Sequence, residues 1–163
     1  MKSIILGLLA AACAAGCAQQ GEPQFGQQDA AAIRQRTQEY VQTFNAKDLE
    51  KFVAFYSGET VFMPPNAPTM RGRDSVADFH KRLFAEGAQG LEMESKDVGG
   101  HGTLAYESGT FTLRRSPEGG PETRDRGKYM FIWRFYRAQN TWLIDYAIWS
   151  SDLPQRVETR PTP

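Results

Sequence analysis

The feature that most constrains the fold is an aromatic-rich stretch at residues 128–153, which holds all three tryptophans of the chain. A short polar turn at residues 138–140 divides this stretch into two strands. In the first strand every second residue is aromatic: Tyr129, Phe131, Trp133 and Phe135. Alternate residues of a strand face opposite sides of a sheet, so one face of this hairpin is aromatic and the other amphipathic. Such strands belong at the centre of a sheet, with a helix or a ligand packed on the aromatic side.

The rest of the chain predicts helices first and strands afterwards. Apolar residues at helical spacing mark residues 29–45, 49–56 and 75–86, and Asp29, Asp48 and Asp74 are the expected N-caps. A brief strand at residues 60–63 ends at two prolines. From residue 91 the apolar period becomes two, which predicts strands up to about residue 100 and over residues 103–114, and residues 116–121 form a turn. This order predicts one α+β domain with helices packed on an antiparallel sheet.

The first residues predict export. Lys2 precedes a short apolar run at residues 4–15, as in a secretory signal, and the run is too short to span a bilayer. The sequence Ala-Ala-Gly-Cys at residues 14–17 resembles a bacterial lipobox, which implies a lipid anchor on Cys17. Because Ala18 rather than aspartate follows, the resemblance implies the periplasmic side of the outer membrane. The alternative is a plain secretory signal that is cut near Ala18.

The resulting division of the chain is a signal peptide at 1–16, a flexible tether at 17–28, the folded domain at 29–154 and a polar tail at 155–163. The 19 basic and 19 acidic side chains give no net charge, which argues against nucleic acid as a partner. The two histidines lie far apart and no cysteine follows Cys17, so we expect neither a metal site nor an internal disulfide. No nucleotide-binding motif is present, and we expect no cofactor.

Five segments in order resemble the NTF2-like superfamily, in particular its SnoaL-like and DUF4440 branch. They are residues 40–48, 61–65, 70–74, 127–133 and 148–154. The resemblance implies an α+β cone, in which three N-terminal helices pack on a strongly bent antiparallel sheet and enclose a pocket. It also implies a homodimer through the outer face of the sheet. Relatives of this kind include ketosteroid isomerases, polyketide cyclases, dehydratases and domains with no known reaction.

The resemblance to ketosteroid isomerases implies roles for single residues. Tyr40 matches the tyrosine that donates a hydrogen bond to the dienolate oxygen, and His80 stands where a supporting tyrosine lies, so a Tyr40–His80 hydrogen bond is expected. The general base would fall at about Pro64 and a second acid near Phe131, and neither residue has acid–base function. Asp145 is the only carboxylate on the expected pocket face of the last strand. The alternative is that local twist turns Asp145 outward, where it would pair with an arginine.

These residues lead to two hypotheses for the function. The favoured one is a non-catalytic or accessory domain that binds a small apolar or aromatic molecule. The other is a cofactor-independent isomerase, cyclase or lyase that works through Tyr40, His80 and Asp145; Tyr40 and His80 could equally be ordinary core residues. The residues expected to line the pocket are Phe44, Met63, Phe79, Tyr106, Ser108, Tyr129, Phe131, Trp133 and Trp149.

Overall fold

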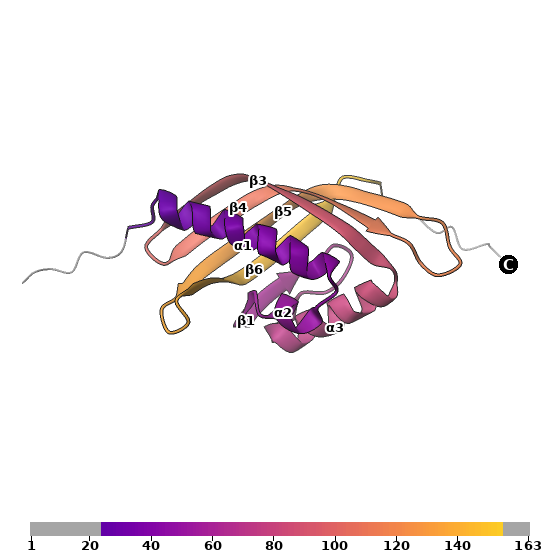
Figure 1. Cartoon of the computed structure of the whole chain (residues 1–163), viewed down its shortest axis with the longest axis horizontal. Helices are drawn as coiled ribbons and strands as arrows, with labels where there is room; N and C mark the ends of the chain where they lie inside the picture. The colour runs from indigo at the N-terminus through magenta and orange to yellow at the C-terminus, as the bar shows by residue number, and fades with distance from the viewer. Residues whose placement is uncertain (1–23, 155–163) are drawn as a thin grey trace, which may run out of the picture.

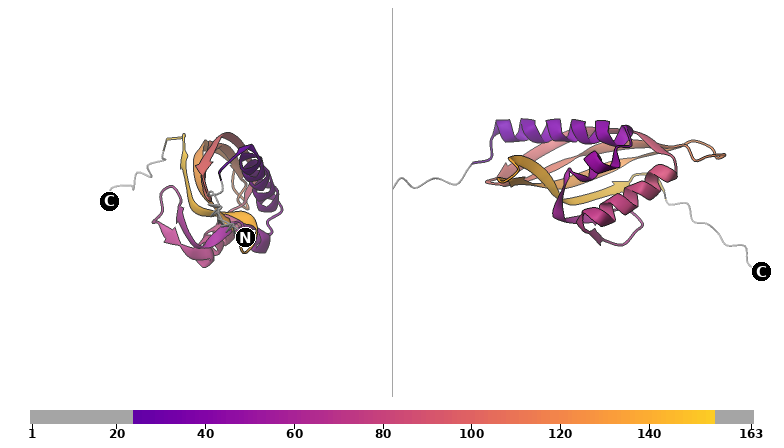
Figure 2. Two further views of the ribbon diagram at one scale, coloured as in Figure 1. Left: turned by 90° about the vertical axis from the view of Figure 1, so that its left-hand side faces the viewer. Right: turned by 60° about the horizontal axis from the view of Figure 1, so that its bottom comes forward.

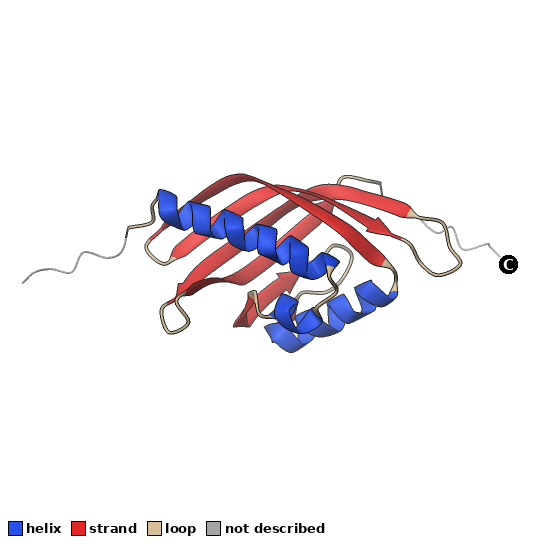
Figure 3. Ribbon diagram, in the orientation of Figure 1, coloured by secondary structure: helices blue, strands red, loops and turns tan. Residues whose placement is uncertain are grey.

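The computed structural model describes residues 24–154, which fold into a curved sheet with helices packed on one side (Figures 1 and 3). In chain order the elements are α1 (Gln27–Asn45), α2 (Leu49–Val53), β1 (Tyr56–Met63), β2 (Met70–Arg71), α3 (Gly72–Ala85), β3 (Ala88–His101), β4 (Leu104–Arg115), β5 (Thr123–Tyr136) and β6 (Thr141–Ser151). The predicted α+β class is confirmed. The predicted signal peptide, Cys17 and the tail at 155–163 lie outside the described residues.

Helix α1 packs on the sheet through one stripe of side chains, spaced three and four residues apart: Ala30, Ile33, Thr37, Tyr40 and Phe44. It begins at Gln27, two residues earlier than predicted and inside the predicted tether. Gly26 is the N-cap, and Asp29, the predicted cap, instead accepts a hydrogen bond of 2.9 Å from the Gly26 backbone N–H. Asp48 caps α2 as predicted, since its carboxylate accepts from the Lys51 N–H at 3.2 Å.

The sheet has the strand order β2-β1-β6-β5-β4-β3. Strands β3 to β6 form the predicted antiparallel meander. One pair of the sheet is parallel, that of β1 with β6, and the sequence analysis did not predict this pairing. Strand β2 has no counterpart in the prediction: Met70 and Arg71 pair with Phe62 and Val61 of β1 directly before α3 begins at Gly72. The N-terminal half of the chain thereby contributes two strands to one edge of the sheet.

The helices lie on the concave side of the bent sheet (Figure 2). The core lies between the helices and the sheet. Tyr129, Phe131 and Trp133, the aromatic face of the hairpin, are 5%, 3% and 0% exposed and point to that side. Met130 and Ile148, on the opposite face, are 43% exposed. The amphipathic hairpin of the sequence is thus a wall with its aromatic face inside.

Within residues 24–154, no helix has the length and apolar character needed to cross a membrane.

Gly87 ends α3 and turns the chain into β3, as predicted. Its φ is +83°, in the left-handed region where a side chain is strained. A Cβ at this position would lie 2.2 Å from the backbone oxygen of Ser116, so the close approach of the two loops also requires glycine.

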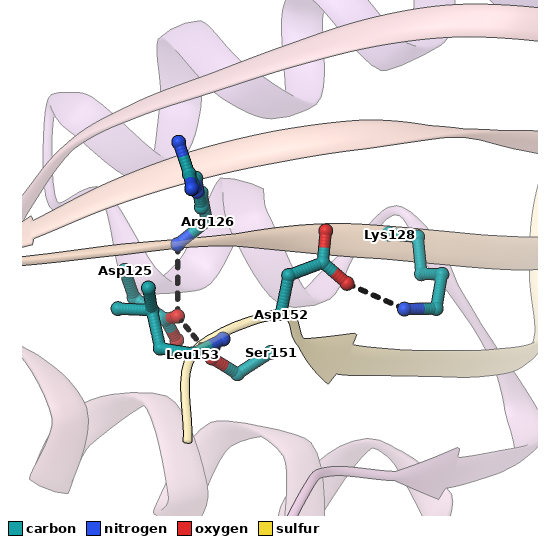
Figure 4. Close-up of polar contacts among 6 residues, drawn as sticks. All are labelled: Asp125, Arg126, Lys128, Ser151, Asp152 and Leu153. Atoms are coloured by element: carbon teal, nitrogen blue, oxygen red, sulfur yellow. Dashed lines mark hydrogen bonds and ion pairs between the residues drawn. The ribbon is translucent and has the colours of Figure 1, made fainter.

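Polar contacts fix the end of β6 against β5 (Figure 4). The Asp152 carboxylate accepts from Lys128 Nζ, and its backbone N–H donates to the Arg126 carbonyl at 2.8 Å. The Ser151 hydroxyl donates to Asp125 at 2.6 Å. Asp152 thus pairs at the end of the strand and does not line the cavity. These contacts hold the strand end that carries Trp149.

Candidate functional site

A cavity of about 60 Å³ lies between α1, α3 and the inner face of the sheet. Its wall is mainly apolar and comes from both helices and from β3, β4, β5 and β6. The lining residues are Tyr40, Phe44, His80, Leu83, Leu91, Met93, Phe111, Leu113, Tyr129, Phe131 and Trp149. Tyr40, Phe44, His80, Tyr129, Phe131 and Trp149 were predicted from the sequence. The aliphatic residues, Met93 and Phe111 were not; Leu91 and Met93 alternate along β3, and that pattern is a signal in the sequence.

Three other residues expected in the pocket lie elsewhere in the core or at its edge. Trp133 is fully buried beyond the cavity wall, where its indole N–H donates to Glu107. Phe79 packs against Phe62 and Trp149, with ring centroids 5.1 and 5.9 Å apart. Met63 is partly buried at the end of β1 and does not line the cavity.

The prediction that Tyr106 and Ser108 of β4 face the pocket is wrong. Tyr106 is 39% exposed on the outer face of the sheet, and Ser108 lies on that same face. The buried alternation of β4 runs instead through Ala105, Glu107, Gly109, Phe111 and Leu113. A leucine, a tyrosine and threonines on the outer face resemble core residues, while the true inner face holds a glutamate and a glycine. The sequence pattern therefore favoured the wrong side.

Asp145 does not reach the cavity, because a β-bulge lies at this point of β6. Ile132 pairs with Tyr146 and Trp133 pairs with Ile144, which leaves Asp145 as the extra residue. Its side chain is 8% exposed and is held by Arg134 Nε at 2.5 Å and by the Tyr136 hydroxyl at 2.9 Å. The expectation that Asp145 lies in the pocket is therefore wrong. The residue pairs with an arginine instead, as the alternative predicted.

Tyr40 is buried at the cavity wall, but its hydrogen-bond partner is not His80. The hydroxyls of Tyr40 and Tyr56 lie 2.8 Å apart, and the Tyr40 ring packs on Phe52 at 4.5 Å between centroids. Burial raises the pKa of the Tyr40 phenol, and the hydrogen bond with Tyr56 only partly opposes this rise. Tyr40 is therefore a neutral phenol at physiological pH, able to donate a hydrogen bond but unable to act as a base.

His80 is 2% exposed and faces the cavity from α3. Its Nδ1 lies 2.8 Å from the carbonyl oxygen of Val76, one helical turn earlier. Since a carbonyl can only accept, Nδ1 carries the proton and Nε2 is unprotonated in the neutral ring. Burial lowers the pKa of His80 to about 4, and the Val76 hydrogen bond opposes the shift weakly. The imidazole is neutral at physiological pH.

Glu107 is the buried carboxylate that the sequence reasoning missed. It is 0% exposed, and its Oε2 accepts from Thr37 Oγ1 at 2.7 Å and from Trp133 Nε1 at 3.1 Å. Burial raises the pKa of the Glu107 carboxyl, and these hydrogen bonds oppose the rise. Burial and the neighbouring Glu107 charge also raise the pKa of the Tyr129 phenol. The carboxylate and the phenol thus form an electrostatically coupled pair beside the cavity.

The last question about the site is whether side chains of the described residues could bind a metal ion. Within the described part of the chain, no three side chains among His, Cys, Asp and Glu come together in a way that could hold an ion.

A family model described as a SnoaL-like domain matches residues 37–141, and the chain belongs to this family. A search of curated proteins found no match. Among solved structures, a ketosteroid isomerase-like protein from Erwinia carotovora atroseptica is 22% identical with a TM-score of 0.71, covering 79% of this chain and all of the other. An NTF2-like superfamily protein from Salmonella enterica serovar Typhimurium is 15% identical with a TM-score of 0.64, covering 78% of this chain and 94% of the other. These likenesses confirm the predicted NTF2-like fold.

Proposed function

We propose that this protein binds a small apolar or aromatic molecule in the cavity between α1, α3 and the sheet, as an accessory domain rather than an enzyme. The observation that carries the proposal is a cavity wall that is almost wholly apolar and includes a tyrosine whose hydroxyl lacks a regular hydrogen bond. The Tyr129 hydroxyl is buried beside Glu107 and Ser95 without a hydrogen bond of regular geometry among residues 24–154, whereas that of Tyr40 is paired with Tyr56. Apolar walls with a few convergent polar groups are typical of small-molecule sites.

The size of the cavity limits the ligand. A volume of about 60 Å³ is well below the roughly 300–1,000 Å³ of pockets for drug-sized molecules. A steroid-sized ligand does not fit this wall, which argues against the substrates that the Erwinia protein's name suggests. Met93 and Trp149 are only partly buried, so their side chains can move aside for a single ring. The expected ligands are therefore molecules of one small ring or a short branched chain.

The alternative is the cofactor-independent isomerase, cyclase or lyase built on Tyr40, His80 and Asp145. Its support is Tyr40, a neutral donor at the cavity wall. Its named residues supply no strong base, because Asp145 is bound to Arg134 away from the cavity and a pKa near 4 makes His80 a weak base. We therefore favour binding over catalysis.

Filling the cavity tests the binding proposal. We expect toluene and phenol to bind the wild-type protein saturably in ligand-observed NMR titrations, and Met93→Trp to weaken the binding of both at least tenfold. The matched control is Leu104→Trp, which adds the same bulk at a residue that is 44% exposed on the outer face. Equal binding to wild type and Met93→Trp would contradict the proposed location of the site.

We also propose a homodimer through the outer face of the sheet. Tyr106, Met130, Tyr146 and Ile148 are each about 40% exposed there, and the strand register places Met130 directly beside Ile148. Contiguous exposed apolar side chains are typical of protein interfaces. We expect Met130→Lys to give a monomer in sedimentation-velocity experiments, while Thr123→Lys, an exposed change at the start of β5, leaves a dimer. A monomeric wild-type protein would refute this interface.

The site of action that we propose is the periplasmic side of the outer membrane, with the tether ending at a lipidated Cys17. This rests on the leader sequence alone. The intact mass of protein from the membrane fraction should include the acyl chains on Cys17, and an unmodified mass would exclude the anchor.

A further inference from the structure

A group of polar side chains lies at one end of the cavity, between β3, β4 and β5. Along β3 it begins two residues beyond the cavity-lining Met93, at Ser95, and along β4 it begins beyond Phe111 and reaches Glu107. Tyr129 belongs to both regions, since its ring lines the cavity and its phenol is coupled to Glu107. The polar group is therefore continuous with the apolar pocket.

Gly109 provides the space for this arrangement. It pairs with Tyr129 on one side and with Ser95 on the other. A Cβ at Gly109 would lie 2.9 Å from the Tyr129 hydroxyl oxygen, so the ring of Tyr129 lies across the bare backbone of β4. Any other residue at this position would displace the phenol from its place near Ser95 and Glu107.

Three buried polar atoms at this point have no hydrogen-bond partner within residues 24–154: Ser95 Oγ, Glu107 Oε1 and the Tyr129 hydroxyl. The hydroxyls of Ser95 and Tyr129 lower the pKa of Glu107 as hydrogen-bond donors would, so all three groups lie close together, although their contacts fall short of regular hydrogen-bond geometry. Buried polar atoms without partners are costly and are rare in folded proteins. A further group that contacts all three would remove that cost.

The hydrogen-bonding capacity of these three atoms indicates which kind of chemical group can bind them. Among the described residues, no lysine, arginine or histidine pairs with Glu107, whose other oxygen is fully used by Thr37 and Trp133. A carboxylate oxygen accepts, while the two hydroxyls both donate and accept. A partner that donates one hydrogen bond to Glu107 and accepts one from each of the two hydroxyls satisfies the site, and a hydroxyl group can do this.

We propose that Ser95, Glu107 and Tyr129 form a polar subsite that binds the hydroxyl group of the pocket's ligand, which is a small alcohol or phenol. The inference rests on the proposed binding function and names the class of its ligand. The ring or chain of the ligand lies against Phe131 and Phe111, and its hydroxyl points along β4 toward Glu107.

Phenol and toluene provide the test, because they have nearly the same shape and differ in the hydroxyl. We expect phenol to bind the wild-type protein about tenfold more tightly than toluene in ligand-observed NMR titrations. The preference should fall to about twofold or less in Ser95→Ala and in Tyr129→Phe, because each variant removes a hydroxyl that can bind the phenol oxygen but not toluene. Ser108→Ala, on the outer face of β4, is the matched control and should keep the full preference.

The outcomes separate this inference from the binding function on which it rests. Toluene binding as tightly as phenol, or a preference that survives both Ser95→Ala and Tyr129→Phe, overturns the subsite and leaves the pocket standing. Failure of both probes to bind overturns both proposals.

Discussion

Replacing Phe52 with alanine is expected to lower the free energy of unfolding by about 3–5 kcal/mol. Phe52 is 0% exposed and lies on α2, a helix of five residues that has no stability of its own. Its ring packs against Tyr40 and His80, with centroids 4.5 and 4.4 Å apart, and against Phe44 at 5.6 Å. The truncation leaves a cavity where α1, α2 and α3 meet, and the aromatic neighbours can fill it only partly.

Chemical denaturation measures this loss, with Phe135→Ala as the matched control. Phe135 is partly buried and packs on Trp142 at 5.5 Å, at the far end of the hairpin. The same truncation there should cost about 1–2 kcal/mol, because the ring is only partly buried and less apolar surface is lost to water. Since the total stability of a domain is about 5–15 kcal/mol, Phe52→Ala removes a large part of it. Equal losses in the two variants would show that α2 does not anchor the helices.

The fold was predictable because its local signals agree with its tertiary structure. The stripe from Ile33 to Phe44 and the alternation from Tyr129 to Trp133 each correspond to one buried face. The parallel pairing of β1 with β6 was not predictable in this way. It joins Phe62 to Ala147, residues far apart in the sequence, and no periodicity within either strand specifies such a partner.

The site was predictable where helices form it and much less so where strands do. On α1 and α3 the apolar stripe places Tyr40, Phe44 and His80 correctly. On β6 a single bulge changes the facing of the strand, so Ile144 and Ala147 are both buried and Asp145 between them turns to Arg134. On β4 the inner face holds Glu107, whose charge alone favours an outward position. Its burial depends on hydrogen bonds from other elements, which the sequence does not display.

The burial of His80 has a consequence for stability in acid. The pKa of His80 is about 4 in the folded protein, against 6.5 for a free histidine. As the pH falls below 6.5, the unfolded chain takes up a proton at this residue while the folded protein does not. Stability is therefore fully present above pH 6.5, decreases as the pH falls toward 4, and levels off once the folded state is protonated as well.

We expect this single group to remove about 3 kcal/mol of stability between pH 6.5 and pH 4, since each unit of pKa difference corresponds to about 1.4 kcal/mol. The free energy of unfolding of His80→Gln, measured over this range, should lose that part of the pH dependence. His101→Gln changes the other histidine of the chain, which is exposed at the end of β3, and should retain the wild-type dependence. Glu107 acts in the opposite direction, because its raised pKa favours the folded state as the pH falls, and it is present in all three proteins. The difference between wild type and His80→Gln therefore isolates the imidazole, and a difference that does not change with pH would mean that solvent reaches His80 in the folded protein.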